Sequence, residues 1–224
     1  MKAVPRDVTA AEFEAKLEAL RSADGRIGMG QIFALAKEEM AMEPGQIERL
    51  LESPVHEVRV GAVSIMDWQA RSKKTTADRK RELFDLYIRR HDRIDTWDLV
   101  DRSAIWVVGE YLVDKPHDVL YQLARSEQPM ERRTAILSTF AFIRRGDTED
   151  ALHLSEWLVN DPDDLVQKAV GWMLREVGKK DPMRHAAFLR AHAATMPRVM
   201  LRYAIEKLPA ADRAHYMGLA KTAK

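Results

Sequence analysis

A four-residue motif recurs along the chain and constrains its fold more than any other feature. Its fullest form is Arg-x-Ala-Ile, and in the weaker copies Gln or Val replaces Arg and Val replaces Ile. The five copies span residues 60–63, 102–105, 133–136, 167–170 and 202–205. Their alanines therefore follow one another at steps of 42, 31, 34 and 35 residues. Such steps are typical of stacked helical hairpins, whose repeats measure about 34–47 residues.

The composition of the motif indicates how these hairpins pack. Its alanine lets two helices approach closely, and the arginine two positions earlier points to another side of the same helix. In a stacked array that arginine recurs along one surface. We therefore predict an all-α fold, a right-handed α-solenoid of antiparallel helix pairs whose second helices line a concave, basic groove. The alternative is an irregular helical bundle.

Apolar residues are spaced for helices along the whole sequence, and no alternating pattern long enough for a convincing strand occurs. The connectors are short, which favours antiparallel neighbours. No linker is long enough to divide the chain, so we expect a single domain over residues 1–224. We expect about a dozen helices, near 9–22, 29–41, 44–52, 55–71, 76–91, 96–112, 117–127, 129–144, 147–159, 162–178, 181–193, 197–207 and 209–220.

Length and composition exclude several classes of protein. With 224 residues, 46% of them hydrophobic, the chain can build a sizeable core. It has no cysteine, which excludes disulfides and thiol chemistry and fits a reducing cytoplasm. No apolar run approaches the roughly 20 residues of a membrane-spanning helix, and the first residues lack the apolar core of a signal peptide. The seven histidines have no metal-ligand spacing, and no glycine-rich phosphate loop occurs.

The charges nearly balance overall but are unevenly distributed. The net charge is +1, yet basic residues cluster within 71–81 and 89–93. Smaller basic pairs stand at 132–133, 144–145 and 179–180. Each cluster by itself is usually a solvated helix surface. If the repeats align several of them on one face, they form a stripe that binds a polyanion.

Trp97 and Asp101 are the first candidates for chemistry. They stand four residues apart on a predicted helix and therefore share one face. On this pattern alone, Trp97 is more often a core residue, and Asp101 a surface or ion-pair residue. Asp98 should face away, where an early-helix carboxylate is favoured by the helix dipole, so we expect it to have a structural role.

The other tryptophans divide into two kinds. We interpret Trp68, Trp106 and Trp157 as residues that pack in the core or between repeats. Trp172 directly follows Gly171, a pair that fits either close helix packing or an exposed ring beside an open groove.

Four segments together make the chain similar to a known family. They are SPVHEVR at 53–59, WDLVD at 97–101, RRTAI at 132–136 and WMLR at 172–175. In order and spacing they resemble the bacterial DNA alkylation repair glycosylases of the AlkD type, which are built from HEAT-like repeats. The resemblance spans roughly residues 30 to 208.

The resemblance implies a role for each matching residue. An Asp and two Trp residues form the active cleft of that family, and an Arg contacts the DNA backbone. Asp101 matches the catalytic carboxylate, and Trp97 and Trp172 match the aromatic walls. Arg133 matches the phosphate contact, with Arg175 as a supporting backbone contact.

The resemblance also implies an activity. It is that of a monofunctional DNA glycosylase, which hydrolyses the N-glycosidic bond of cationic N3- or N7-alkylated purines such as 3-methyladenine and 7-methylguanine in base excision repair. The substrate is double-stranded DNA containing alkylated bases. We expect a monomer of the bacterial cytoplasm or nucleoid, with neither cofactor nor metal. The alternative is a non-catalytic helical-repeat protein that binds DNA or a protein partner.

Overall fold

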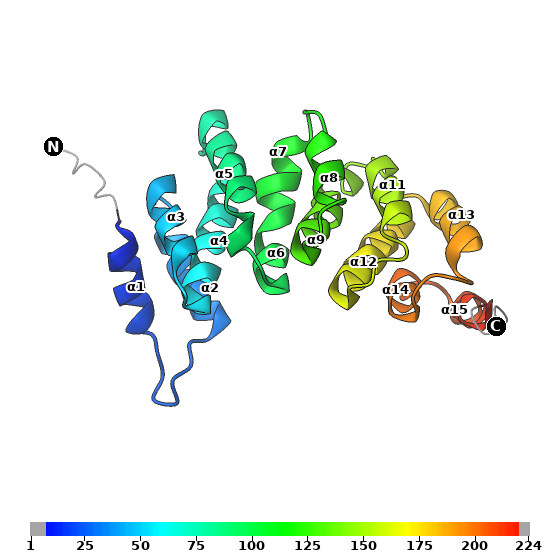
Figure 1. The fold of residues 1–224 in the computed structure, drawn as a ribbon, viewed down its shortest axis with the longest axis horizontal. Coiled ribbons are helices and arrows are strands. Elements are labelled where there is room, and N and C mark those ends of the chain that lie inside the picture. The colour runs from blue at the N-terminus through cyan, green and yellow to red at the C-terminus, as the bar shows by residue number, and fades with distance from the viewer. Residues whose placement is uncertain (1–7, 220–224) are drawn as a thin grey trace. The chain divides into compact units, whose positions relative to one another are not determined.

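The structure is a computed structural model that describes residues 8–219, and all regular secondary structure in this range is helical (Figure 1). The α-helices are α1 (Ala10–Glu18), α2 (Met29–Glu38), α3 (Pro44–Glu52), α4 (His56–Arg71), α5 (Ala77–Arg89), α6 (Trp97–Ser103), α7 (Glu110–Leu112), α8 (Asp118–Leu123), α9 (Pro129–Ser138), α10 (Phe140–Ile143), α11 (Glu149–Trp157), α12 (Asp164–Lys180), α13 (Pro182–His192), α14 (Arg198–Ala204) and α15 (Ala210–Leu219). A 3₁₀ turn, η1 (His91–Arg93), precedes α6, and a π-helical segment, η2 (Ala104–Gly109), follows it.

Contacts between helices divide the chain into two compact units, Met1–Tyr111 and Leu112–Lys224. In the first unit α4 is central and contacts α2, α3, α5 and α6. In the second unit α12 has the same position among α9, α11, α13 and α14. Each unit is thus a stack of helices that pack on near neighbours in the sequence, which confirms the all-α, solenoid-type fold. The single domain, the handedness and the basic groove stay predictions.

The alanines of the repeated motif lie where the motif predicts them. All five are at most 1% exposed, and they fall on α4, at the start of η2, and on α9, α12 and α14. Close approach also explains Gly61, the neighbour of the first alanine. A Cβ atom on Gly61 would come within 2.5 Å of the Phe13 ring, so this glycine lets α1 pack directly on α4.

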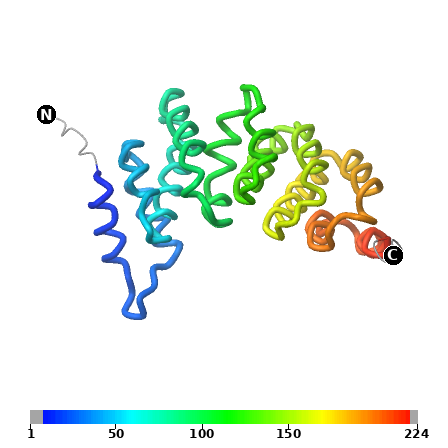
Figure 2. Tube along the Cα trace, viewed as in Figure 1, coloured from blue at the N-terminus to red at the C-terminus, as the bar shows by residue number. Residues whose placement is uncertain are grey.

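Local signals set the helix starts. Thr9 and Glu12 form a capping box at the start of α1, and Pro44 and Pro129 begin α3 and α9. The tube in Figure 2 shows that the longer connection between α1 and α2 projects away from the helices. Among residues 8–219 no helix combines the length and the apolar character needed to cross a membrane.

Two of the expected helices are interrupted. The helix predicted over 96–112 changes to π geometry at Ala104, and the one over 129–144 breaks at Thr139. At both places a hydroxyl donates to a preceding backbone carbonyl. Ser103 Oγ lies 2.7 Å from the Leu99 oxygen, and Thr139 Oγ1 lies 2.6 Å from the Ile136 oxygen. Such bonds compete with the regular helix pattern and bend the helix.

Candidate active site

Trp97 is the first residue of α6, and Asp101 follows it by one turn on the same face. The Trp97 side chain is 52% exposed, so it is not a core residue. Asp101 is half-buried. The first unit therefore presents an accessible indole on the helix face that also carries the half-buried carboxylate of Asp101.

Asp98 has the structural role expected of it. Its Oδ1 accepts a hydrogen bond of 2.7 Å from the Thr96 hydroxyl, and its Oδ2 lies 2.7 Å from Nε2 of His56 on α4. Burial opposes the charge of this carboxylate, but the bonds from Thr96 and His56 outweigh it and lower the pKa of Asp98 below its usual value. Asp98 thus joins the start of α6 to the start of α4.

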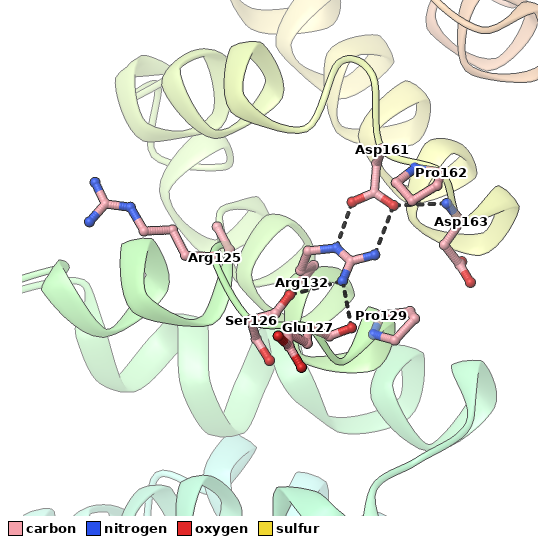
Figure 3. A pocket seen from close by; sticks show the side chains of 9 residues that line it. Arg125, Ser126, Glu127, Pro129, Arg132, Asp161, Pro162 and Asp163 are labelled. Atoms are coloured by element: carbon pink, nitrogen blue, oxygen red, sulfur yellow. Dashed lines mark hydrogen bonds and ion pairs between the residues drawn. The ribbon is translucent and has the colours of Figure 1, made fainter.

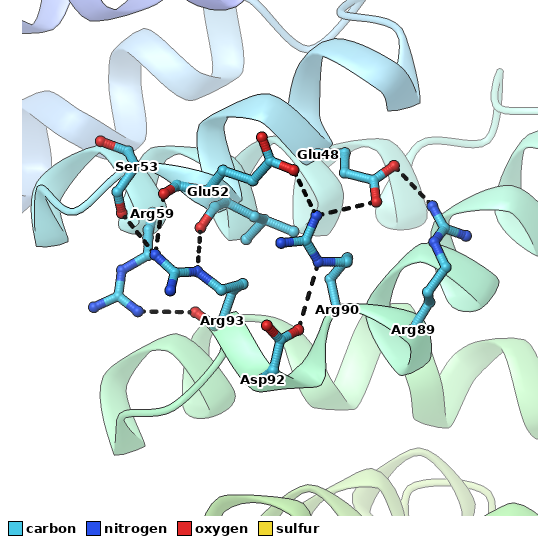
Figure 4. A network of polar contacts seen from close by, with 9 residues as sticks. Glu48, Glu52, Ser53, Arg59, Arg89, Arg90, Asp92 and Arg93 are labelled. Carbon is cyan, nitrogen blue, oxygen red and sulfur yellow. Dashed lines mark hydrogen bonds and ion pairs between the residues drawn. The ribbon is translucent and has the colours of Figure 1, made fainter.

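Arginines of the 89–93 cluster tie the segment before α6 to α3 and the residue after it (Figure 4). Arg93 donates to the backbone carbonyls of Leu51, at 3.1 Å, and of Ser53, at 3.3 Å. Arg90 pairs with Glu48 at 3.2 Å and with Glu52 at 2.9 Å. These side chains are thus engaged within the protein, and the stripe that binds a polyanion stays a prediction.

A buried carboxylate of α4 faces α6. Asp67 of α4 is fully buried and forms ion pairs with Arg71 at 2.8 Å and Arg102 at 3.1 Å. Burial raises the pKa of Asp67 above its usual value, against the opposing influence of both arginines. Arg102, the arginine of a repeated motif, thus turns toward α4 and pairs with its buried carboxylate.

The same arginines lie over aromatic rings. The guanidinium carbon of Arg71 is 4.3 Å from the centroid of the Trp106 ring, and that of Arg102 is 5.2 Å from Trp68. Lys37 Nζ is 5.0 Å from Trp68 as well. Sequence reasoning treats these tryptophans as plain packing residues and misses the cations that cover them. The contacts above join different helices, so spacing gives no sign of them, whereas Arg71 also lies over Trp68 at 5.7 Å within α4, at a spacing of three residues.

Trp157 lies at the end of α11 with much of its ring open to solvent. It is 47% exposed, with Tyr121 at its edge and the Arg125 guanidinium 4.4 Å from its ring centroid. Trp157 is therefore not a core residue, but its contacts with Tyr121 of α8 and with Arg125 fit the packing between repeats that is the other interpretation.

Trp172 lies on α12, where its half-buried ring is 6.5 Å from that of Phe140 and tilted by 42°. The preceding Gly171 has no room for a side chain, since a Cβ atom would meet the backbone of Met200 on α14. Close packing thus explains the glycine, while the indole beside it keeps part of its surface accessible.

Arg133 and Arg175 both have partners within the second unit. Arg133 is 5% exposed and donates to the backbone carbonyl of Leu165 in the first turn of α12. Arg175, one turn after Trp172, pairs with Glu206 and with Glu176. The second unit therefore brings the Arg133 side chain to the helix that carries Trp172 and Arg175.

Arg132, the neighbour of Arg133, is wholly occupied by the fold (Figure 3). Its Nε and Nη2 donate to the two carboxylate oxygens of Asp161 at 2.6 and 3.0 Å. Its Nη1 donates to the carbonyls of Ser126 and Glu127 at 2.9 and 3.0 Å. The open hollow of about 610 Å³ beside it contains none of the predicted site residues. Within residues 8–219 no three His, Asp or Glu side chains cluster closely enough to bind a metal.

Comparison with known proteins adds an independent observation. Residues 27–208 match the sequence profile of the DNA alkylation repair enzymes. No protein with curated annotation matches the sequence. A solved structure, described as a predicted DNA alkylation repair enzyme from Enterococcus faecalis, is 17% identical. It superposes with a TM-score of 0.66 over 90% of this chain and 95% of that one, which shows a shared fold.

Proposed function

The chain belongs to the DNA alkylation repair enzyme family, and within that family we propose that it is a monofunctional DNA glycosylase. The proposed reaction is hydrolysis of the N-glycosidic bond of purines alkylated at N3 or N7, such as 3-methyladenine and 7-methylguanine, in double-stranded DNA. The pair Trp97 and Asp101 on one face of α6 carries this proposal, because it joins an accessible indole to a carboxylate.

The chemistry of the lesion suits a carboxylate. Alkylation at N3 or N7 makes the purine cationic and hence a good leaving group, so little general-acid help is needed. Cleavage then builds positive charge on the deoxyribose, as in other glycoside hydrolyses. In this proposal Asp101 stabilises the oxocarbenium-like sugar and orients or deprotonates the attacking water. Water takes the base's place at the sugar, and the neutral alkylpurine leaves with the electrons of the broken bond.

Trp97 and Trp172 are the proposed aromatic walls. Each carries an indole whose surface is partly open. A cation over such a ring gains about 0.5–2 kcal/mol. The positive charge is on the base in the substrate and on the sugar in the transition state, so the rings favour both the lesion and the reaction.

Arg133 and Arg175 are the proposed contacts to the DNA backbone. Phosphate contacts of this kind fix the register of a protein on DNA without reading its sequence. Arg133 bonds the start of α12 and Arg175 pairs with Glu206, so binding of a phosphate would add to or replace these contacts. We further propose that the protein acts as a monomer in the bacterial cytoplasm, without metal or cofactor.

The test is direct. Duplex DNA treated with a methylating agent is incubated with the protein, and released 3-methyladenine and 7-methylguanine are quantified. We expect release of free base with an intact sugar–phosphate backbone. DNA binding that weakens with salt, without base release, would instead identify a non-catalytic DNA-binding protein. No affinity for DNA at low salt would favour a protein-binding scaffold.

A further inference from the structure

The segment that carries Trp97 is held from α4, and we infer that His56 is a positioning residue of the proposed active site. The inference rests on the proposed function, because it assigns His56 the task of fixing Trp97 and Asp101. It is carried by the contacts between the start of α4 and the start of α6.

His56 reaches α6 through a single carboxylate. It is the first residue of α4, and its Nε2 lies 2.7 Å from Oδ2 of Asp98, the second residue of α6. Because an ionised carboxylate only accepts hydrogen bonds, Nε2 carries the proton. The other oxygen, Oδ1, is occupied by the Thr96 hydroxyl. Asp98 thus bridges the histidine of one helix and the N-cap of the next.

The bridge also bears on how α6 begins. Thr96 is the N-cap residue, but its side chain makes no capping hydrogen bond to the helix backbone and instead donates to Asp98. The first turn of α6, which begins with Trp97, therefore depends on Asp98 for its orientation. Since Asp98 is fixed by His56, that orientation is set by α4.

A second anchor lies on the same face of α4, three residues further on. Arg59 donates to Oδ1 of Asp95 at 2.7 Å and to the carbonyl of Arg93 at 3.1 Å. Arg59 thereby holds the loop before α6, whereas His56 holds the helix itself. The two anchors bracket Trp97, whose own half-exposed side chain contributes little to its placement.

Placement of these groups matters because catalysis depends on geometry more steeply than stability does. A displacement of about 1 Å at a reacting centre can cost a factor of about 100 in rate. The His56 side chain is 41% exposed, so its removal leaves a small packing defect and mainly releases Asp98. Loss of the bond should thus lower the rate much more than it lowers stability.

The experiment compares His56→Ala and His56→Gln with the wild type. Glutamine places an N–H near the position of Nε2, so it keeps the donor to Asp98. His153→Ala removes an exposed histidine from α11 in the other unit and serves as the matched control. Two readouts are used: the indole ¹H–¹⁵N signal of Trp97, assigned by its absence in Trp97→Phe, and base release under single-turnover conditions.

We expect His56→Ala to move the Trp97 indole signal and to lower the single-turnover rate about 10–100-fold, with affinity for methylated DNA little changed. His56→Gln should restore both, and His153→Ala should change neither. An unmoved indole signal in His56→Ala would overturn the inference, as would a His56→Gln protein that behaves like His56→Ala. If the wild type releases no base, the proposed function fails, while the indole signal still decides whether His56 positions Trp97.

Discussion

Gly171 lies directly against the backbone of Met200: a Cβ atom on this glycine would come within 2.5 Å of the Met200 carbonyl oxygen. The same atom would lie 2.6 Å from Cβ of Tyr203. Neither neighbour is the free end of a flexible side chain, so helices α12 and α14 have a fixed closest approach here. Because Trp172 is the next residue, this contact also fixes the point from which its indole projects.

Substitution of this glycine should therefore destabilise the protein. We expect Gly171→Ala to lower the free energy of unfolding by about 1–3 kcal/mol, as overpacking of a core does. Urea denaturation measures the change. Gly30→Ala on α2 is the matched control, because a Cβ atom there meets nothing within 4 Å. Equal effects of the two substitutions would contradict the close approach.

Asp101→Asn should abolish base release, with a loss of at least about 100-fold, because it removes the charge that stabilises the sugar cation. Binding of methylated duplex DNA should persist, since the side chain keeps its size. Release of 7-methylguanine and a filter-binding assay measure the two properties. Asp78→Asn, an exposed position in the first turn of α5, is the control. Unchanged release would exclude Asp101 as the catalytic carboxylate.

The two most exposed tryptophans of the described residues offer a matched comparison. We expect Trp97→Leu to slow base release about 2–30-fold, the equivalent of about 0.5–2 kcal/mol of cation–π stabilisation. Trp157→Leu, at a ring of similar exposure, should leave the rate unchanged. Single-turnover kinetics test both variants, and equal rate losses would argue against a special role for Trp97.

The salt dependence of DNA binding distinguishes the arginines. Each phosphate contact contributes about 0.9 to the slope of log K against log salt concentration. We expect Arg133→Ala and Arg175→Ala each to reduce the slope by about that amount. Arg132→Ala should leave it unchanged, because Asp161 and two carbonyls occupy the Arg132 guanidinium. If the slope falls in Arg132→Ala and not in Arg133→Ala, the phosphate contact belongs to Arg132 and the proposed assignment is wrong.

His185 makes stability depend on pH. It is buried in α13, and burial lowers its pKa below the usual value. The unfolded chain therefore binds a proton more readily than the folded protein. Above pH of about 6.5 both states are neutral at this site, and the free energy of unfolding should fall as the pH drops below that value. Urea denaturation at pH 7.5 and 5.5 measures this decrease in the free energy of unfolding. We expect the decrease to be smaller in His185→Gln than in the wild type. If the free energy of unfolding changes equally with pH in the two proteins, His185 does not make stability depend on pH.

Much of the fold is predictable because it depends on local spacing. Helix α3 has the bounds that its apolar spacing and Pro44 predict, 44–52, and the motif alanines are buried as a repeat requires. The interruptions at Ala104 and Thr139 are not predictable in the same way. At both places a hydroxyl group bonds backward to the helix backbone, and apolar periodicity carries no record of such bonds.

In the site, too, local relations are predictable from the sequence and contacts between distant residues are not. Trp97 and Asp101 are predictable as a pair, since four residues on one helix fix their relation. The bonds that link His56 to Asp98 and Asp67 to Arg102 join residues 42 and 35 positions apart in the sequence. A single sequence does not tell which helix faces which, so only the packed structure reveals these partners.

The dense contacts among neighbouring helices also bear on how the chain is made. Helix α4 packs on α2 and α3, which precede it, and α12 packs on α9 and α11. Each of these helices thus finds part of its docking surface already synthesised, and the rest follows soon after in the sequence. Folds dominated by such local contacts form fast. During translation the protein can therefore grow hairpin by hairpin, with little apolar surface left uncovered at any stage.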